Sequence, residues 1–186
     1  KYADRTAYRE KEFGICLNWT WAENESEIES LALGLMELGV QPGDHVAIIG
    51  SNRPALYWSM VASQMAGAVP VPLYQDAAAE EMAYVLEHCG ARFIIAEDQE
   101  QVDKIMSIKD QLPALEWLFY CNPRGMADYE EAYIKSFDEV QALGREFQDK
   151  SPNYFAEEVA KVTGEDIALM AYTSGTTGQP KGVMLS

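Results

Sequence analysis

The sequence predicts an α/β fold, in which a largely parallel sheet has helices on both of its faces. Short apolar runs alternate with helical patterns, and the runs lie at 45–49, 68–73, 92–96 and 115–120. This alternation is typical of parallel sheets, because a helix has to return the chain to the same edge before the next strand begins. Such sheets bind ligands at the carboxyl ends of their strands.

Two helices have clear start signals. Thr20 and Glu23 have the spacing of a capping box, and apolar residues then repeat on one helical face until Gly39, the expected C-cap. Pro54 is expected to begin a second helix that extends to about residue 66, since proline is favoured in a first turn. The apolar positions of the first helix are Ile28, Leu31, Leu35 and Leu38.

The pattern continues through the middle of the chain. The run that contains Pro70 and Pro72 is expected at the end or edge of a sheet, because proline cannot donate a backbone hydrogen bond. A third helix is predicted to end at Gly90 and a fourth before Pro113. The segment 122–151 is less regular, with one amphipathic helix.

Composition and charge exclude several classes of protein. Of the 186 residues, 48% are apolar and 24% are charged, which is typical of a globular domain. The net charge of −16 excludes nucleic-acid binding by counterion release and electrostatic binding to anionic membranes. Recognition of a phosphate group would therefore need a local device.

The cysteines and histidines give no sign of a metal site. Cys16, Cys89 and Cys121 are scattered and odd in number, which predicts reduced thiols in a cytoplasmic protein. His45 and His88 are expected to have structural roles. No apolar run is long enough to span a bilayer, so no transmembrane segment is predicted.

The segment that carries chemistry lies near the end of the chain. An apolar run leads into a glycine-rich and hydroxyl-rich stretch with one lysine, and a second apolar strand follows. We predict that both flanking strands are buried. The candidate ATP phosphate-binding residues are Thr173, Ser174, Gly175, Thr176, Thr177, Gly178 and Lys181.

These residue types suit a polyphosphate. Glycines bring backbone N–H groups close to phosphate oxygens, and short hydroxyls can bond phosphate or a magnesium ion. Lys181 supplies a point charge. No Asp or Glu follows Asp166, although the chain is strongly acidic. A flexible hairpin loop is the alternative, which the lysine between Pro180 and Gly182 disfavours.

The segment does not have the spacing of a Walker A motif. That motif needs four residues between its first glycine and a Gly-Lys pair, with a helix after it. Here Lys181 follows Pro180, and the next segment is expected to be a strand. A P-loop NTPase is therefore disfavoured.

Residues 172–183 resemble the signature loop of the adenylate-forming superfamily, which includes acyl-CoA synthetases, luciferases and the adenylation domains of peptide synthetases. Residues 38–44 and 67–74 support this resemblance. Segments 51–54 and 72–74 are most similar to long-chain fatty-acid CoA ligases.

The resemblance implies a reaction in two steps. A carboxylate attacks the α-phosphate of Mg-ATP to give an acyl-adenylate and pyrophosphate, and coenzyme A then displaces AMP to give a thioester. It also implies that the loop holds the β- and γ-phosphates, that Lys181 reaches their oxygens and that Thr173 contacts Mg²⁺. No catalytic residue is expected within this chain, so the chain alone is predicted to be inactive.

The resemblance also implies a domain organisation. The chain is expected to be an N-terminal part of the enzyme and to belong to its large N-terminal domain. Residues 1–44 would supply the first strands and helix of one α/β subdomain, and 45–186 most of a second. The rest of that domain and the C-terminal domain would lie outside this chain.

Several alternatives stay open. The carboxylate could be an aryl acid or an amino acid in place of a long-chain fatty acid, and a flavodoxin-like nucleotide-binding module would predict bound FMN. Expected partners are small molecules only (fatty acid, ATP and CoA), with no nucleic acid. The sequence does not decide whether the whole enzyme contacts a membrane peripherally or forms a homodimer.

Overall fold

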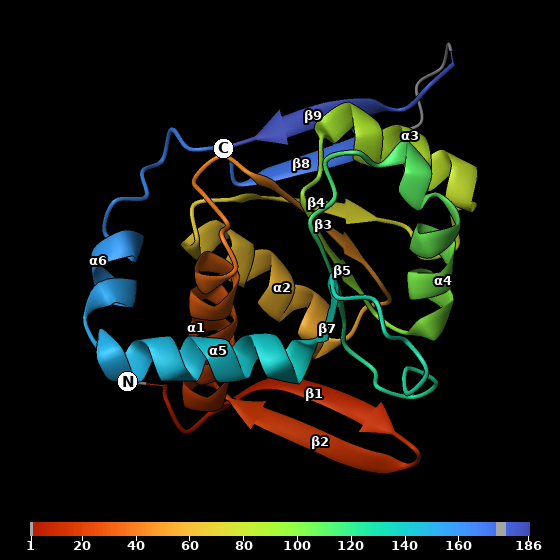
Figure 1. The fold of residues 1–186 in the computed structure, drawn as a ribbon. Coiled ribbons are helices and arrows are strands. Elements are labelled where there is room, and N and C mark those ends of the chain that lie inside the picture. Colours follow the sequence, from red (N-terminus) through yellow and green to blue (C-terminus); the bar gives the residue numbers. More distant parts are fainter. Residues whose placement is uncertain (1, 174–177) are drawn as a thin grey trace.

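The centre of the molecule is a parallel sheet of five strands, as the sequence predicts (Figure 1). The computed structural model describes residues 2–173 and 178–186. In spatial order the strands are β4 (Val69–Leu73), β3 (His45–Ile49), β5 (Phe93–Ala96), β6 (Trp117–Tyr120) and β7 (Ile134–Ser136). Neighbouring strands pair in parallel throughout.

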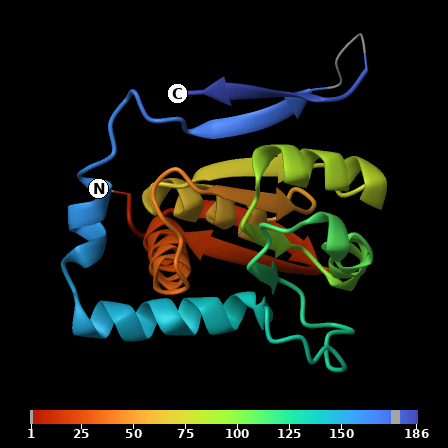
Figure 2. The same ribbon diagram turned by 45° about the horizontal axis from the view of Figure 1, so that its top comes forward.

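Helices cover both faces of this sheet, and two antiparallel hairpins lie outside it (Figures 1 and 2). The helices are α1 (Trp21–Glu37), α2 (Pro54–Met65), α3 (Ala79–Cys89), α4 (Gln99–Ser107), α5 (Phe137–Lys150) and α6 (Tyr154–Val159), with a 3-10 turn at Lys109–Gln111. The hairpins are β1–β2 (Thr6–Glu12 and Ile15–Thr20) and β8–β9 (Leu169–Thr173 and Lys181–Leu185).

The central strands are apolar at nearly every position because both of their faces are buried. In β3, Val46 and Ile48 join a core with helices α1, α2 and α5. Ala47 and Ile49 join a second core with α3 and α4 on the opposite face. Helix α1 thus shares a core with β3, and the expected subdomain division at residue 44 stays a prediction about a longer protein.

The predicted helix signals act as expected. Thr20 and Glu23 form the capping box at the start of α1, and Pro54 occupies the first turn of α2. Gly90 caps α3 in the left-handed conformation, with φ of 62°. The C-cap of α1 is Leu38, so Gly39, the C-cap expected from the sequence, lies one residue beyond the observed cap and has φ of 98°.

Strand β4 is an edge strand for the reason that its prolines suggest. The N–H of Val69 donates to Asp44 on the β3 side, at 2.8 Å. Alternate residues of a strand bond in opposite directions, so Pro70 and Pro72 face away from β3 and offer no N–H to a sixth strand. Hairpin β8–β9 packs against β4 as a separate sheet.

Three expectations need correction. The sequence did not predict β7, whose three residues pair with β6, or α6. Both are too short to show a periodic pattern. Both strands that flank the glycine-rich segment were expected to be buried. Strand β8 is only partly buried, with Thr173 exposed, and strand β9 is exposed at every residue. It lies on the outer side of its hairpin, away from β4 (Figure 2), so its apolar residues are not covered by the described part of the chain.

Helices α1 and α5 cross at a contact between their backbones. A Cβ atom added to Gly34 would lie 2.0 Å from the carbonyl oxygen of Val140, and one added to Gly144 would lie 1.8 Å from that of Ser30. Only glycine permits this approach, because any larger side chain would overlap the opposing backbone. The contact holds α5 against α1 although about 100 residues separate the helices in the sequence.

We predict that Gly144→Ala lowers the free energy of unfolding by about 1–3 kcal/mol, because the added methyl group forces the two helices apart. Chemical denaturation followed by circular dichroism would measure the change. Gly164→Ala is the matched control, since nothing lies within 4 Å of the added carbon at that turn. Equal effects of the two substitutions would show that the helix crossing is not tightly packed.

Candidate functional site

Hairpin β8–β9 brings the two ends of the glycine-rich segment together. Thr173 is paired with Lys181 at the end of the ladder next to the connecting segment. Residues that pair across an antiparallel ladder lie on the same face, so this hydroxyl and this ammonium group share a face. Both side chains are exposed. The arrangement places a hydrogen-bond donor and a positive charge at the two ends of the segment.

Between these ends, only part of the candidate site is described. Ser174, Gly175, Thr176 and Thr177 lie outside the described residues. Gly178 has φ of 132°, a backbone conformation that favours glycine. The structure therefore brings together Thr173 and Lys181 and gives Gly178 a backbone suited to glycine, and the predicted phosphate contacts stay predictions.

The donor types at this site fit phosphate oxygens better than a metal cage. One neutral hydroxyl and one ammonium can donate to an anion, whereas a protein-bound cation needs several oxygen or nitrogen ligands. In the described part of the chain, no group of histidine, cysteine and carboxylate side chains is arranged to hold a metal ion. A magnesium contact at Thr173 would therefore rely on oxygens from the nucleotide as well.

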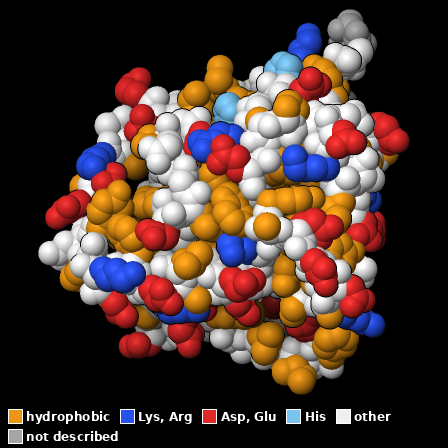
Figure 3. All heavy atoms as spheres, viewed as in Figure 1, with side chains coloured by type: hydrophobic (Ala, Val, Ile, Leu, Met, Phe, Trp, Pro, Cys, Tyr) orange, Lys and Arg blue, Asp and Glu red, His pale blue; other side chains and the backbone are white. Residues whose placement is uncertain are grey.

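The surroundings make Lys181 unusual. No acidic residue lies between Asp166 and Ser186, although the chain has a net charge of −16. Acidic side chains are spread across the face of the molecule seen in Figure 3. A local positive charge on such a protein can attract an anion only at short range, because the overall field is repulsive and salt screens it within about 8–10 Å.

Two side chains from the main body hold β8. The side-chain amide of Gln64, near the end of α2, donates to the carbonyl oxygen of Ala168 at 2.7 Å. His88, near the end of α3, places Nδ1 2.6 Å from the hydroxyl oxygen of Tyr172. The helices that connect parallel strands end at the amino edge of the sheet, so Gln64 and His88 hold the hairpin near this edge. The expectation that a ligand binds at the carboxyl edge therefore does not apply to this hairpin.

Tyr172 is partly buried among its neighbours. Burial, followed by the proximity of Cys89 and Tyr84, raises the pKa of Tyr172 to about 12. A Cβ atom on Gly182, its partner across the ladder, would lie only 3.3 Å from Cζ of the ring. The hydroxyl stays protonated at neutral pH and can donate a hydrogen bond. Sequence analysis missed the contact with His88, because 84 positions separate the two residues.

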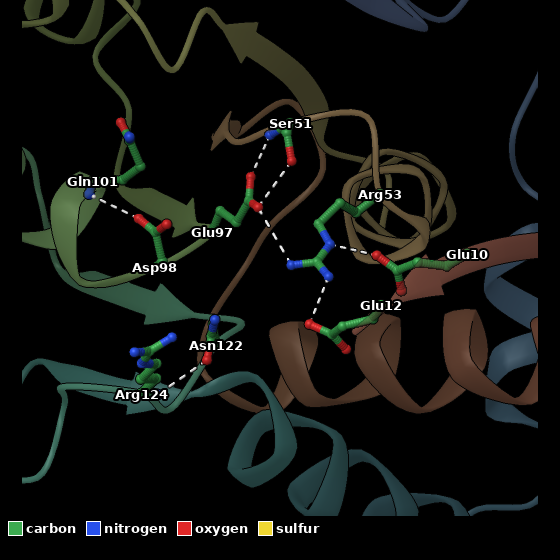
Figure 4. A network of polar contacts seen from close by, with 9 residues as sticks. All are labelled: Glu10, Glu12, Ser51, Arg53, Glu97, Asp98, Gln101, Asn122 and Arg124. Carbon is green, nitrogen blue, oxygen red and sulfur yellow. Dashed lines mark hydrogen bonds and ion pairs between the residues drawn. The ribbon is translucent and has the colours of Figure 1, made fainter. Parts of the chain in front are cut away.

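A second polar feature lies at the opposite end of the molecule, beside hairpin β1–β2 (Figure 1). There Arg53 is surrounded by three carboxylates (Figure 4). Its guanidinium bonds Glu10 through Nε and Glu12 through Nη2, the latter at 2.8 Å, and Nη1 lies 3.7 Å from Glu97. Glu97 also accepts hydrogen bonds from the backbone and hydroxyl of Ser51.

This network joins the hairpin to the carboxyl ends of β3 and β5. The hydrogen bond to Glu10 and then that to Glu12 raise the pKa of Arg53. The network lines part of a pocket of about 240 Å³, whose lining also includes the apolar residues Trp58 and Ile95. The network's acidic groups outnumber its one cation and already engage it, so we assign Arg53 to docking of the hairpin.

We predict that Arg53→Met lowers the free energy of unfolding by about 1–2 kcal/mol. A hydrogen bond to a charged group contributes about 1.5–3 kcal/mol, and the 31% exposure of the Arg53 side chain reduces that value through solvent screening. Undocking of the hairpin should also speed tryptic cleavage after Arg9 and Lys11. Denaturation curves and timed digestion with mass spectrometry would measure both effects.

Arg124→Met is the control for this prediction. Arg124 is exposed, and its side chain makes no ion pair with any residue in 2–173 or 178–186. Unchanged digestion of the hairpin in Arg53→Met would mean that other contacts, such as the stacking of Tyr8 on Tyr57, hold it in place.

Two further findings concern the cysteines and the length of the helices. Cys16, Cys89 and Cys121 are all free thiols, as predicted, and burial raises the pKa of Cys89 to about 11 and that of Cys121 to about 12. Within the described ranges, each helix is too short or too polar to cross a bilayer.

Proteins similar to this chain over nearly its whole length are CoA ligases. The long-chain-fatty-acid–CoA ligase ACSBG2 of Xenopus laevis is 30% identical over 100% of this chain and 24% of its own length. The ligase FadD15 of Mycobacterium bovis is 30% identical over 98% of the chain and 29% of its own length. The chain thus spans 24% and 29% of the lengths of these two relatives.

Solved structures agree in fold. The anthranilate CoA ligase AuaEII, in complex with anthranoyl-AMP, matches with a TM-score of 0.80 and 27% identity, over 98% of this chain and 32% of that one. Acetoacetyl-CoA synthetase from Streptomyces lividans, at 23% identity, matches in fold with a TM-score of 0.79, over 97% of this chain and 28% of its own. The family of AMP-binding enzymes matches residues 1–186. The chain therefore belongs to the AMP-binding enzyme family, the adenylate-forming ligases whose signature its glycine-rich segment resembles.

Proposed function

We propose that this chain supplies the phosphate-binding segment of a longer ATP-dependent acyl-CoA synthetase. Family membership supports the reaction class, and the placement of Thr173 and Lys181 on one face of hairpin β8–β9 supports the role of the segment. The enzyme would convert a carboxylate and ATP to an acyl-adenylate and pyrophosphate, and then transfer the acyl group to coenzyme A. The chain by itself would catalyse neither step, because most groups that position the reactants would lie elsewhere.

The roles of individual residues follow from their chemistry. Lys181 would bond oxygens of the β- and γ-phosphates, and the backbone near Gly178 would approach them closely. The hydroxyl of Thr173 would bond a phosphate oxygen or a magnesium ion shared with the nucleotide. Ser174, Gly175, Thr176 and Thr177 would complete the phosphate contacts. Adenylation of this kind depends on positioning and charge stabilisation, so no protein nucleophile is required.

We further propose a long-chain fatty acid as the substrate and the cytoplasm as the location. Support for the substrate comes from the ligases of Xenopus laevis and Mycobacterium bovis, whose names specify long-chain fatty acids. An aryl acid is the second candidate, because the ligase with the TM-score of 0.80 acts on anthranilate. Family membership removes the reason to consider a flavodoxin-like module.

One prediction of the proposed function concerns Lys181→Ala in an enzyme of full family length that carries this chain. The substitution removes a charge-assisted hydrogen bond worth about 1.5–3 kcal/mol, which corresponds to a loss of about 10- to 150-fold in the adenylation step. Exchange of labelled pyrophosphate into ATP would measure this step. Thioester formation from supplied acyl-adenylate should fall much less, because no pyrophosphate takes part.

Lys161→Ala is the matched control, since Lys161 is an exposed lysine that pairs with Glu158 on the protein surface. It should change neither step. Equal losses in both steps for a well-folded Lys181→Ala enzyme would show that Lys181 does not act on the phosphates. No loss in either step would contradict the proposed role of the whole segment.

The second prediction separates the two candidate substrates in the same enzyme. A pocket for a long chain contributes roughly 0.8 kcal/mol for each methylene group that it buries. Four such groups would favour hexadecanoate over anthranilate by about 100-fold or more in kcat/KM. Rates of acyl-CoA formation at limiting concentrations of each acid would measure the ratio. A ratio in favour of anthranilate would assign the enzyme to aryl acids.

A further inference from the structure

His88 links the main body of the protein to the strand that leads into the phosphate-binding segment. Its Nδ1 lies 2.6 Å from the hydroxyl oxygen of Tyr172, and the two rings meet edge to face with centroids 5.7 Å apart. Tyr172 precedes Thr173 directly, so this contact is one peptide away from the first residue of the proposed site. Nothing in the family assignment gives His88 a role.

His88 is exposed, but the end of the helix that carries it is held by several contacts. The next residue, Cys89, is buried, and its carbonyl oxygen lies 2.6 Å from Nδ1 of His45 on β3. Gly90 then ends helix α3 in the left-handed conformation. The ring of Tyr84, one turn earlier on α3, lies 5.7 Å from the imidazole of His88. These contacts fix the end of α3, and with it the position from which His88 reaches β8.

The geometry of hairpin β8–β9 links the position of His88 to the positions of Thr173 and Lys181. Side chains alternate along a strand, so Tyr172 points towards the main body and its neighbour Thr173 points to the other face. Tyr172 is also paired with Gly182, which directly follows Lys181. Fixing the Tyr172 ring therefore orients both ends of the phosphate-binding segment at once. Apart from this contact, the only side-chain hydrogen bond from the described main body to β8 or the residue before it comes from Gln64, and it reaches Ala168, at the far end of the strand.

We propose that His88 is a positioning residue for the phosphate-binding segment and that it acts through the hydroxyl of Tyr172. This inference rests on the proposed function of that segment. His88 contacts no reactant. It restricts where Thr173 and Lys181 lie, so that ATP finds their donors already oriented. Preorganisation of this kind lowers the entropy lost on binding.

The test uses four variants of a full-length enzyme that carries this chain: His88→Ala, His88→Asn, Tyr172→Phe and the double variant of His88→Ala with Tyr172→Phe. A neutral hydrogen bond contributes about 0.5–1.5 kcal/mol, so we expect each of the first and third variants to raise KM for ATP by about 2- to 12-fold. The amide of His88→Asn offers an acceptor near the place of Nδ1 and should restore most of the affinity. Thioester formation from supplied acyl-adenylate should be unchanged.

The double variant tests whether His88 acts through Tyr172. If His88 acts through Tyr172, the double variant should be no worse than the more impaired single variant. Tyr74→Phe is the matched control, because it removes a hydroxyl from a tyrosine that is 83% exposed and leaves the contact between His88 and Tyr172 intact. It should leave KM for ATP unchanged.

Three results would overturn the inference. These are multiplied losses in the double variant, an Asn variant as impaired as the Ala variant, and equal losses in both half-reactions. Lys181→Ala, measured in the same assay, separates this inference from the proposed function. If Lys181→Ala lowers adenylation as predicted and the His88 variants do not, only the role of His88 is wrong. If Lys181→Ala has no effect, the proposed function itself fails.

Discussion

The architecture depends on the need to cover both faces of the two central strands. Strands β3 and β5 are apolar at almost every position, and a buried isoleucine or phenylalanine stabilises a fold by roughly 1.5–3 kcal/mol only if its surface leaves water. Alternation sends Val46 and Ile48 to one side and Ala47 and Ile49 to the other. Each side therefore needs its own layer of helices. The glycine contact between α1 and α5 completes one layer, and α3 and α4 form the other.

At the β4 edge of the sheet, the constraint is the number of backbone N–H groups that can bond a further strand. Pro70 and Pro72 leave the outer side of β4 without N–H donors at alternate positions, so hairpin β8–β9 packs against it without extending the ladder. Side-chain hydrogen bonds attach the hairpin to the main body instead, from Gln64 at one end of β8 and from His88 at the other. Hairpin β1–β2 is likewise docked through Arg53 and not through strand pairing. The two hairpins thus depend on individual contacts, whereas the sheet depends on burial.

This division suits a site for a polyphosphate on an acidic protein. The overall charge repels an anion, so binding has to come from backbone and side-chain donors within a few ångströms of the ligand. Because the hairpin lies outside the sheet, donors near its connecting segment are not used in further strand pairing. Thr173 and Lys181 are exposed there on one face, and the local sequence contains no carboxylate that would neutralise the lysine. Placing this hairpin through a few defined contacts orients the donors without surrounding them.

Local sequence determined the parts of this protein whose signals lie among neighbouring residues. The capping pair Thr20 and Glu23, the prolines of β4, and the hydroxyl, glycine and lysine types of the phosphate-binding segment could all be identified without coordinates. Strand β7 could not, because its three residues are stabilised by pairing with β6 and not by their own pattern. Only the tertiary structure decided that β9 is exposed and that His88 meets Tyr172, Gln64 meets Ala168 and Arg53 meets Glu10. These pairs are 84, 104 and 43 positions apart, and such contacts depend on how whole helices and strands pack, which no local preference specifies.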